Sequence, residues 1–545
     1  MKSETLKNSL NAHGWVGLII SLPLFIVFWA GAITLFHPEM MQWAQLPNYT
    51  IDVNAKEKQQ QVSYNGLIER QIQEYNILPD ARISLQIPTE KSPYLRIGFR
   101  APIDTPLEQT QLESQAEPEK EPEEIKTENI NLLIDPYTGE VFTEHNQFGL
   151  ANFLYTLHYS LHIPQGSYIV GIIALFFFVI IITGVVVQLK NMVKNFFLYR
   201  KNQTTRTTMN DMHNVIGVIS LPYAAMYAIT GIMLNLLILV QIPSVFLLYE
   251  GDLNAISKDA GFYNFKGKPS GESAQMPVLE NFILEHNRQY KAKATRLTAY
   301  NYGDKNAVIQ IRGLFNDGFS KPFTHFYKVS TDSYPGEMNY SDDNVFSTGL
   351  LMLYSMHFAN YAGTDMRLLY FILAMAFCGM IVAGNVLWIV KRQKKNEHPK
   401  TLAFTRGSTL GACLGVITAT AFAILLERVL PEGVIEREHL IEYAFGIMLL
   451  IITCTGFFAK RLRPFIGYNF IASAVLLIIT LAYEWVVLGG TIIALGNAGY
   501  QSIWYLSAGL FVISVLLLWI GTKIIRDIEP VAVVGLDVIS ISGKY

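Results

Sequence analysis

The sequence predicts an α-helical polytopic membrane protein with about eight transmembrane helices and two small α+β modules on one side of the membrane. Three observations lead to this fold class. Of the 545 residues, 51% are apolar and only 16% are charged, which is too apolar for a soluble chain of this length. Eight apolar runs are long enough to span a bilayer, and an internal repeat relates two parts of the chain.

The first motif of the repeat is a histidine followed by a glycine four residues later. Residues 11–17 (NAHGWVG) precede an Ile-Ser-Leu-Pro segment, and residues 211–217 (DMHNVIG) precede a second copy of that segment. His13 and His213 are 200 residues apart (213 − 13 = 200), and the glycines keep this offset. A constant offset indicates a duplicated structural unit.

The second motif precedes a long apolar run in each copy. Residues 154–162 (LYTLHYSLH) return as residues 353–361 (LYSMHFANY). This alignment pairs His158 with His357 and places His162 opposite a tyrosine. The duplicated unit therefore has a histidine near each end of its helix pair.

The eight apolar runs are each near the ~20 residues of helix that cross the ~30 Å hydrocarbon layer. The first run also resembles a signal peptide. It is longer than the ~7–15 residues of a signal's apolar region, and no clean cleavage site follows, so we expect a retained helix. The predicted spans are residues 15–36, 166–189, 214–240, 367–390, 408–426, 441–459, 465–488 and 503–525.

Charge sets the expected orientation. Lysine and arginine gather between spans two and three, four and five, and six and seven, and again after span eight. Because these residues are enriched in cytoplasmic connections, both termini are expected in the cytoplasm. The net charge of −2 and the lack of a clustered basic stripe argue against nucleic-acid binding. Cys378, Cys413 and Cys454 lie in apolar runs, which favours packing over a disulfide or zinc framework.

The two segments facing outward each have the pattern of a helix followed by strands. In the first, residues 105–128 are rich in Glu, Pro and Gln and are expected to form a solvated loop. Its last predicted element, residues 133–141, reads as a strand, a turn and a strand. The other predicted elements are a helix at 62–72 and strands at 82–87 and 94–99, then a helix at 276–289 and strands at 295–300 and 307–311, with a degenerate copy of the ending at 327–337.

The sequence therefore divides into seven expected segments. They are the first span (1–36), the first outer module (37–150), an interfacial helix with span two (151–190), a cytoplasmic loop with span three (191–240), the second outer module (241–350), an interfacial helix with span four (351–395) and a four-helix membrane domain (396–545).

The Asp135-Pro136-Tyr137-Thr138-Gly139 turn between two strands, flanked by spans carrying His13 and His158, resembles the PepSY-associated transmembrane family over about residues 8–395. That family includes bacterial inner-membrane proteins similar to ferric-siderophore reductases with b-type haem. The resemblance implies two periplasmic PepSY modules and transmembrane electron transfer. PepSY modules also occur in proteins with no known redox role.

The four repeat-matched histidines are the candidate metal ligands. His13 and His213 lie on spans that run in the same direction, so both are expected at the cytoplasmic end, while His158 and His357 are expected at the outer end. A parallel repeat relates its halves by an axis along the membrane normal, which puts each pair at one depth. Two imidazoles can hold one haem iron from its two faces, an arrangement suited to electron transfer.

The outer ligands have alternatives. His162 is one turn from His158 and is expected to face the same way, so it is a candidate for the outer ligand or for a group at the substrate edge. His37, at the outer tip of span one, is a third candidate. Gly17, Gly217, Gly31 and Gly231 either make room for a flat macrocycle or let helices pack closely.

Two further groups of residues have structural interpretations that the sequence favours. His286 and His325 are expected to be surface polar residues. Glu427, Glu442 and Glu484 are expected to anchor helices at headgroup level or to pair with Arg428, with a quinol or proton-handling site as the alternative.

Together with the four histidines, the family resemblance implies a haem-dependent ferric-chelate reductase of the bacterial inner membrane. It would carry electrons through two haem b groups from a cytoplasmic reductase or a quinol to a periplasmic acceptor, most plausibly a ferric siderophore. The alternative is a non-redox membrane protein whose modules bind peptide or regulate a protease.

Overall fold

The computed structural model describes most of the chain. The described residues are 3–44, 62–89, 94–103, 126–143, 149–190, 192–198, 200, 204–252, 255, 265, 267–315, 322–329, 336–338, 345–359, 361–393, 399–431, 434–497 and 501–526. The predicted loop at 105–128 lies outside them up to residue 125, and so do residues 330–335 of the second module's ending.

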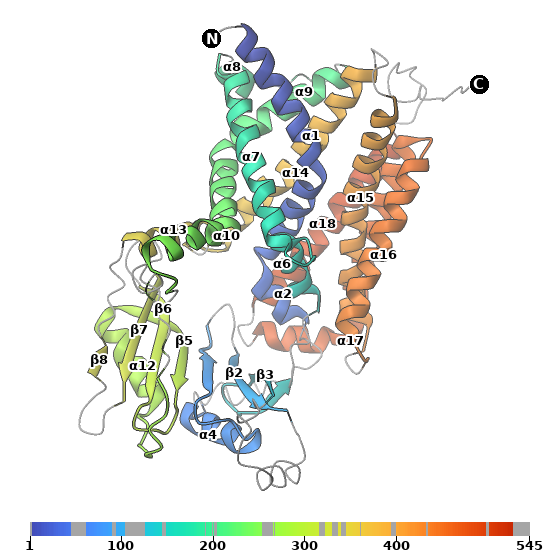
Figure 1. Cartoon of the computed structure of the whole chain (residues 1–545). Helices are drawn as coiled ribbons and strands as arrows, with labels where there is room; N and C mark the ends of the chain where they lie inside the picture. Colours follow the sequence, from blue (N-terminus) through green and yellow to red (C-terminus); the bar gives the residue numbers. More distant parts are fainter. Residues whose placement is uncertain are drawn as a thin grey trace, which may run out of the picture.

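Long apolar helices form a bundle, and the strands gather beyond the end of the bundle opposite the start of the chain (Figure 1). Among the described residues, seven helices are long and apolar enough to cross a membrane, and a bent pair raises the number of spans to as many as eight. The polytopic fold is thus confirmed. The helices are α1 (Ser3–Thr34), α7 (Gly166–Gln188), α14 (Thr364–Gln393), α15 (Pro399–Val429), α16 (Arg437–Phe458), α17 (Leu462–Asn497), α18 (Gln501–Arg526) and the bent pair α9 (Thr205–Ile219) and α10 (Leu221–Leu248).

The third span is broken, which differs from the continuous run expected at 214–240. Helices α9 and α10 meet at Ser220 with a bend of 68°. Pro222 occupies the first turn of α10, where its missing N–H needs no helical partner. The Ser220 N–H ends α9 by donating to the Ile216 carbonyl at 2.8 Å. The repeat equivalent, Pro23, is accommodated inside α1.

Four short helices flank the spans. They are α2 (His37–Ala44), α6 (Gly149–Ser160), α8 (Met192–Phe196) and α13 (Val345–His357). Helices α6 and α13 carry His158 and His357 near their C-terminal ends, as the motif predicted. A turn with positive φ at Leu161 and His162 then separates α6 from α7.

The outer modules have the expected helix-then-strand order. The first contains α4 (Tyr64–Glu74), β1 (Arg82–Gln86), β2 (Leu95–Pro102), β3 (Thr127–Ile134) and β4 (Val141–Thr143). The second contains α12 (Leu279–Tyr290), β5 (Ala292–Tyr300), β6 (Val308–Phe315), β7 (Pro322–Lys328) and β8 (Gly336–Met338).

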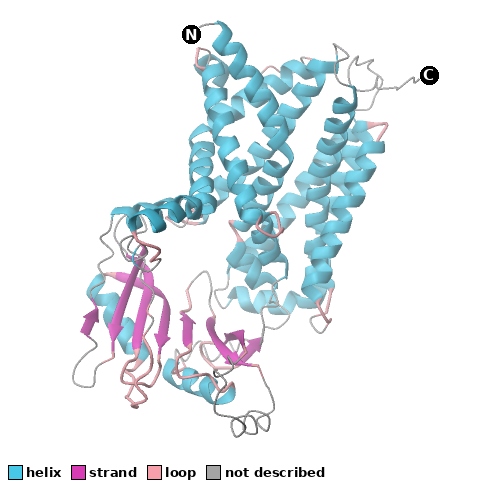
Figure 2. Ribbon diagram, viewed as in Figure 1, coloured by secondary structure: helices cyan, strands magenta, loops and turns pink. Residues whose placement is uncertain are grey.

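The modules share one sheet, which the sequence analysis did not predict. Antiparallel pairing of β1 with β5 joins them edge to edge and gives the strand order β4-β3-β2-β1-β5-β6-β7-β8. The strands, drawn in magenta, lie beyond one end of the helix bundle (Figure 2). Pairing these two edges removes their unpaired backbone groups from solvent. Buried side chains of α4 and α12, such as Ile68 and Phe282, join Leu85, Ile97 and Leu297 in a common core, so both helices cover the same face.

Buried polar contacts connect α2 with α14, α15 and α17. Arg367 on α14 binds Glu39 on α2 through two nitrogens, at 2.7 and 3.0 Å, and both residues are less than 9% exposed. In α15 and α17, Arg428 and Glu484 are 3.8 Å apart, and Glu484 also accepts a hydrogen bond from Trp43 of α2 at 2.8 Å. The membrane helices therefore depend on polar contacts with α2.

Replacing Glu39 with alanine should destabilise the protein by about 3–5 kcal/mol, because Arg367 would remain buried without its carboxylate. Glu272→Ala is a matched control. It removes an ion pair with Lys305 whose side chains are 57% and 67% exposed, so solvent screening should leave stability almost unchanged. Thermal unfolding of the detergent-solubilised variants measures the difference. Equal midpoints would contradict the proposed importance of the buried pair.

Two histidine pairs as candidate metal centres

The sequence-matched histidines meet in two pairs. His13 of α1 and His213 of α9 have ring centres 6.1 Å apart, with their planes at 85°. His158 of α6 and His357 of α13 have ring centres 5.9 Å apart, with their planes at 45°. A metal ion bonded at ~2.0 Å to one nitrogen of each of two opposed imidazoles would hold the ring centres about 6 Å apart. Each pair is therefore spaced to share one ion.

In all four histidines, Nδ1 has a hydrogen-bond partner. Nδ1 of His13 and His213 lies 2.9 and 3.1 Å from the carbonyl oxygens of Ile180 and Met380, which are themselves 200 residues apart (380 − 180 = 200). Nδ1 of His158 lies 2.8 Å from the Val27 carbonyl oxygen. Because a carbonyl only accepts, these three imidazoles carry their proton on Nδ1.

His357 reaches the same protonation state through a side chain. Its Nδ1 lies 2.7 Å from Thr230 Oγ1, and that hydroxyl donates its single proton to the Met226 carbonyl at 2.8 Å. With its proton on that carbonyl, the hydroxyl accepts from Nδ1–H, which gives His357 the tautomer of the other three histidines. Within the described part of the chain, Nε2 of the four histidines makes no hydrogen bond, which leaves its lone pair for a metal.

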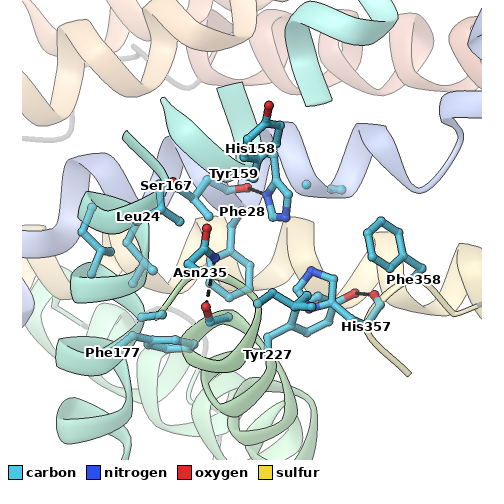
Figure 3. Close-up of a pocket in the computed structure, with 18 of the residues that line it drawn as sticks. Leu24, Phe28, His158, Tyr159, Ser167, Phe177, Tyr227, Asn235, His357 and Phe358 are labelled. Carbon is cyan, nitrogen blue, oxygen red and sulfur yellow. Dashed lines mark hydrogen bonds between the residues drawn. The ribbon is translucent and has the colours of Figure 1, made fainter. Parts of the chain in front are cut away.

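A cavity adjoins each pair. The cavity lined by His158 and His357 has a volume of about 350 Å³, and Figure 3 shows both side chains reaching it from separate segments. The cavity lined by His13 and His213 has a volume of about 460 Å³. Both volumes are within the ~300–1,000 Å³ of small-molecule and cofactor sites.

A cluster of three phenylalanines separates the cavities, and the sequence analysis missed it. Phe28 lines the outer cavity, Phe377 lines the inner cavity and Phe177 lines both. The rings of Phe28 and Phe377 stack with centres 4.4 Å apart, and Phe177 contacts both rings edge-on. Phe177 and Phe377 keep the 200-residue offset, so the repeat could have identified them.

The sequence analysis expected the four glycines of the repeat either to make room for a macrocycle or to let helices pack closely. The structure shows what each of them contacts. A Cβ on Gly31 would lie 2.6 Å from His158 Cε1 and Nδ1, so this glycine makes room for the imidazole. Gly17 and Gly217 line the inner cavity. Gly231 packs against Ala174 and also lines the outer cavity.

A further glycine pair was overlooked. A Cβ on Gly184 would lie 3.1 Å from His13 Cε1, and one on Gly384 would lie 3.3 Å from His213 Cε1. These two glycines are also 200 residues apart (384 − 184 = 200). They are repeat equivalents that let α7 and α14 approach the inner histidines closely.

The expectation that His162 faces the same way as His158 is wrong. Helix α6 ends at Ser160, and the left-handed turn that follows directs His162 toward α16. There its Nε2 lies 3.4 Å from a carboxylate oxygen of Glu442. His37 contacts Asn152 through Nε2 at 3.1 Å, outside the His158–His357 pair.

The structure also corrects the expectations for the other polar residues. His286 is 3% exposed and its Nε2 lies 3.0 Å from His325 Nδ1, so it is a core residue of the second module. Glu427 and Glu484 are buried inside the protein; Glu484 pairs with Arg428 at 3.8 Å, as one of the expectations had it, and Glu427 pairs with Arg437 at 3.0 Å. These contacts favour a structural role for the two carboxylates.

The cysteines do not form disulfides: Cys378 and Cys413 are buried and Cys454 is exposed. Among the described residues, no group of three or more His, Cys, Asp or Glu side chains could hold a metal ion. Each histidine pair would therefore supply two side-chain ligands to a bound metal.

Comparison with known proteins identifies the family to which the chain belongs. The family model described as "PepSY-associated TM region" matches residues 10–391, which include all four histidines. This chain belongs to the PepSY-associated TM family. It is also similar to a protein of Pseudomonas aeruginosa named "Uncharacterized protein PA4219", with 21% identity over 346 residues that cover 59% of this chain and 85% of that protein.

Gly31→Ala should destabilise the protein by about 1–3 kcal/mol, because its Cβ would overlap the His158 ring. Gly446→Ala is the control, since a Cβ there meets no atom within 4 Å. Combining Gly31→Ala with His158→Ala should recover most of the loss. Thermal unfolding of the single and double variants measures the coupling, and purely additive effects would contradict the contact.

Proposed function

We propose that the protein carries electrons across the bacterial inner membrane through two b-type haems. His13 and His213 would hold one haem, and His158 and His357 would hold the other. The observation that carries this proposal is the matching geometry of the two pairs, each with Nδ1 engaged and Nε2 left to a cavity. When bound, the haems would supply two one-electron redox centres, one near each face of the membrane.

The protein's own residues would fix the ligands and exclude water. Hydrogen bonds at Nδ1 hold each imidazole in one tautomer and orientation, which is the usual role of partners behind a metal ligand. Tyr227 adds a second restraint by donating to the His357 carbonyl at 2.8 Å. The rings of Phe28, Phe177 and Phe377 fill the space between the cavities with apolar atoms.

The arrangement also suits the thickness of the membrane. The hydrocarbon layer is ~30 Å thick, which is too far for one electron step, and two centres divide the distance. The cavities share Leu24 and Phe177 among their lining residues, so little more than one layer of side chains lies between them.

The direction of transfer follows from the expected topology. The basic connections at the ends of α7 and α14 favour a cytoplasmic position for the His13–His213 pair and a periplasmic position for the joined sheet. The donor would be a cytoplasmic reductase or a quinol. The acceptor would be a periplasmic ferric chelate, most plausibly a siderophore, whose iron is released after one-electron reduction.

His13→Ala and His213→Ala should each remove one of the two haems and leave the other, because a single imidazole holds the iron only from one face. The measurement is the haem content per chain of the purified protein from its visible spectrum. His439→Ala is the control, since that histidine is exposed and its ring lies beside Glu442 and Tyr443, away from both histidine pairs. Full haem content in both His13 and His213 variants would show that the ligand assignment is wrong.

Electron transfer itself can be measured in proteoliposomes. With a reductant enclosed and a membrane-impermeant ferric chelate on the other side, the wild-type protein should produce ferrous iron that an external ferrous indicator captures. His357→Ala should abolish this signal. A protein that purifies without haem and gives no ferrous iron would instead support the non-redox alternative, in which the outer modules bind peptide or regulate a protease.

A further inference from the structure

Three basic side chains line the inner cavity, which lies toward the end of the bundle where the chain begins, opposite the strands (Figure 1). They are Arg206 of α9 and Lys391 and Arg392 of α14, and they share the cavity with His13 and His213. No aspartate or glutamate is among the described residues that line it. The cavity therefore presents positive charge to a group bound between the two imidazoles.

Basic residues at this end of the bundle are also expected from the topology of the protein. Arg206 and Lys391 are exposed, and within the described part of the chain neither makes an ion pair. Arg200, in contrast, binds both carboxylate oxygens of Asp211, at 2.8 and 2.9 Å. Because cytoplasmic connections are enriched in such residues, the charges alone do not define a binding site.

Trp388 provides an observation that topology does not explain. Its side chain is only 6% exposed and lines the inner cavity. Its indole N–H is buried and has no hydrogen-bond partner among the described residues. The indole N–H groups of Trp29, Trp43 and Trp504 all donate to protein oxygens at 2.8–3.0 Å. Because buried donors in native proteins are nearly always bonded, we expect an acceptor from outside the chain at Trp388.

One face of α14 connects this indole to the inner histidines. Gly384, Trp388 and Arg392 are spaced four residues apart, and side chains at this spacing share a helix face. A Cβ on Gly384 would lie 3.3 Å from His213 Cε1, so the face begins beside that ring. At its other end, the guanidinium of Arg392 lies over the Trp388 ring, 4.1 Å from the ring centre. The face thus runs from an imidazole, past a buried N–H, to a guanidinium.

The other half of the repeat has no such face. Gln188 and Met192 precede Trp388 and Arg392 by 200 residues (388 − 188 = 200; 392 − 192 = 200) and line the same cavity. Gln188 Nε2 donates to Asn214 Oδ1 at 2.8 Å, and the methionine is uncharged. The cationic edge of the cavity therefore lies on the α14 side, which breaks the symmetry of the two halves.

We propose that Trp388, Lys391 and Arg392 bind the carboxylates of the haem in the inner cavity, with Arg206 contributing from α9. The inference rests on the proposed function and extends it from the iron to the acidic edge of the porphyrin. A guanidinium binds a carboxylate through paired, charge-assisted hydrogen bonds, and an indole N–H can only donate. These residues fix the haem in one orientation, with its carboxylates toward the C-terminal end of α14.

Redox titration of the purified full-length protein, in nanodiscs of zwitterionic lipid, tests the cations. Two haems give two transitions in the visible spectrum, and the transition missing from His213→Ala belongs to the inner haem. Lys391→Gln and Arg392→Gln should each shift that transition to lower potential, because ferric haem carries one more positive charge than ferrous haem. A tenfold change in the reduction equilibrium is about 59 mV for one electron, which sets the expected size.

The outer transition is an internal control in the same titration. None of the described residues lining the outer cavity is a lysine, arginine, aspartate or glutamate, so its haem has no such cation to lose. Its potential should stay unchanged in both variants, which also shows that each variant is folded. Lys523→Gln is the matched control, because Lys523 lies 5.0 Å from the Trp519 ring near the end of α18 and lines neither cavity. It should leave both transitions unchanged.

Trp388→Phe tests the indole N–H separately. The substitution keeps an aromatic ring beneath Arg392 and removes the donor. The propionate bending band in the resonance Raman spectrum should shift from its wild-type position, because the carboxylate loses a hydrogen bond. Trp519→Phe is the matched control and should leave the band in place, since Trp519 lines neither cavity.

Two results would overturn the proposal. One is an inner transition and a propionate band that are the same in the wild type and in all three variants. The other is that the variants lose only bound anionic phospholipid, in nanodiscs that contain it, while the inner haem is unaffected; the cations would then form a lipid headgroup site. A protein with no haem transition would overturn the proposed function as well, whereas two transitions that ignore the variants would overturn this inference alone.

Discussion

The hydrogen bonds at Nδ1 of the four histidines are the constraint on which the site depends. An imidazole that points into a cavity without such a bond could rotate or change tautomer, and its Nε2 would not be held for a metal. Three of the four acceptors are backbone carbonyls of neighbouring membrane helices, and the fourth is Thr230. Packing of the helices therefore sets the orientation of the four imidazoles.

Helix packing is in turn controlled by small residues and by the buried ion pairs. Gly184 and Gly384 allow close approach to the inner histidines, and Gly31 allows it for His158. The pair between Glu39 and Arg367 fixes α2 against α14 on the sheet side of the bundle. Helices α15 to α18, which follow the region matched by the family, join α2 through Glu484 and Trp43. Those helices thus support the histidine-bearing unit.

Much of the fold could be predicted because the repeat and the apolar runs are written directly in the sequence. The same 200-residue offset that aligned His13 with His213 also relates Gly184 to Gly384 and Phe177 to Phe377. These residues could therefore have been identified from the sequence. The hydrogen-bond partners of Nδ1 could not be predicted, because every residue type has a backbone carbonyl like that of Ile180. The break at Ser220 was also hidden, since Pro23 at the equivalent position leaves α1 continuous.

Two other features depend on tertiary context. The pairing of β1 with β5 involves strands whose sequences alternate like any half-buried strand, so nothing marks them as partners. The orientation of His162 follows from a turn just beyond Ser160, where helical spacing no longer applies. The strand pattern was correct and the arrangement of the two modules decided the sheet, whereas the helical spacing assumed for His162 was wrong.

The most direct measurement is an electron-microscopy map of the full-length protein purified without added cofactor. The account predicts two planar densities, one between Nε2 of His13 and His213 and one between Nε2 of His158 and His357, with the Nδ1 hydrogen bonds retained. Empty cavities in protein that has kept its fold, or a density that contacts only one histidine of a pair, would contradict it.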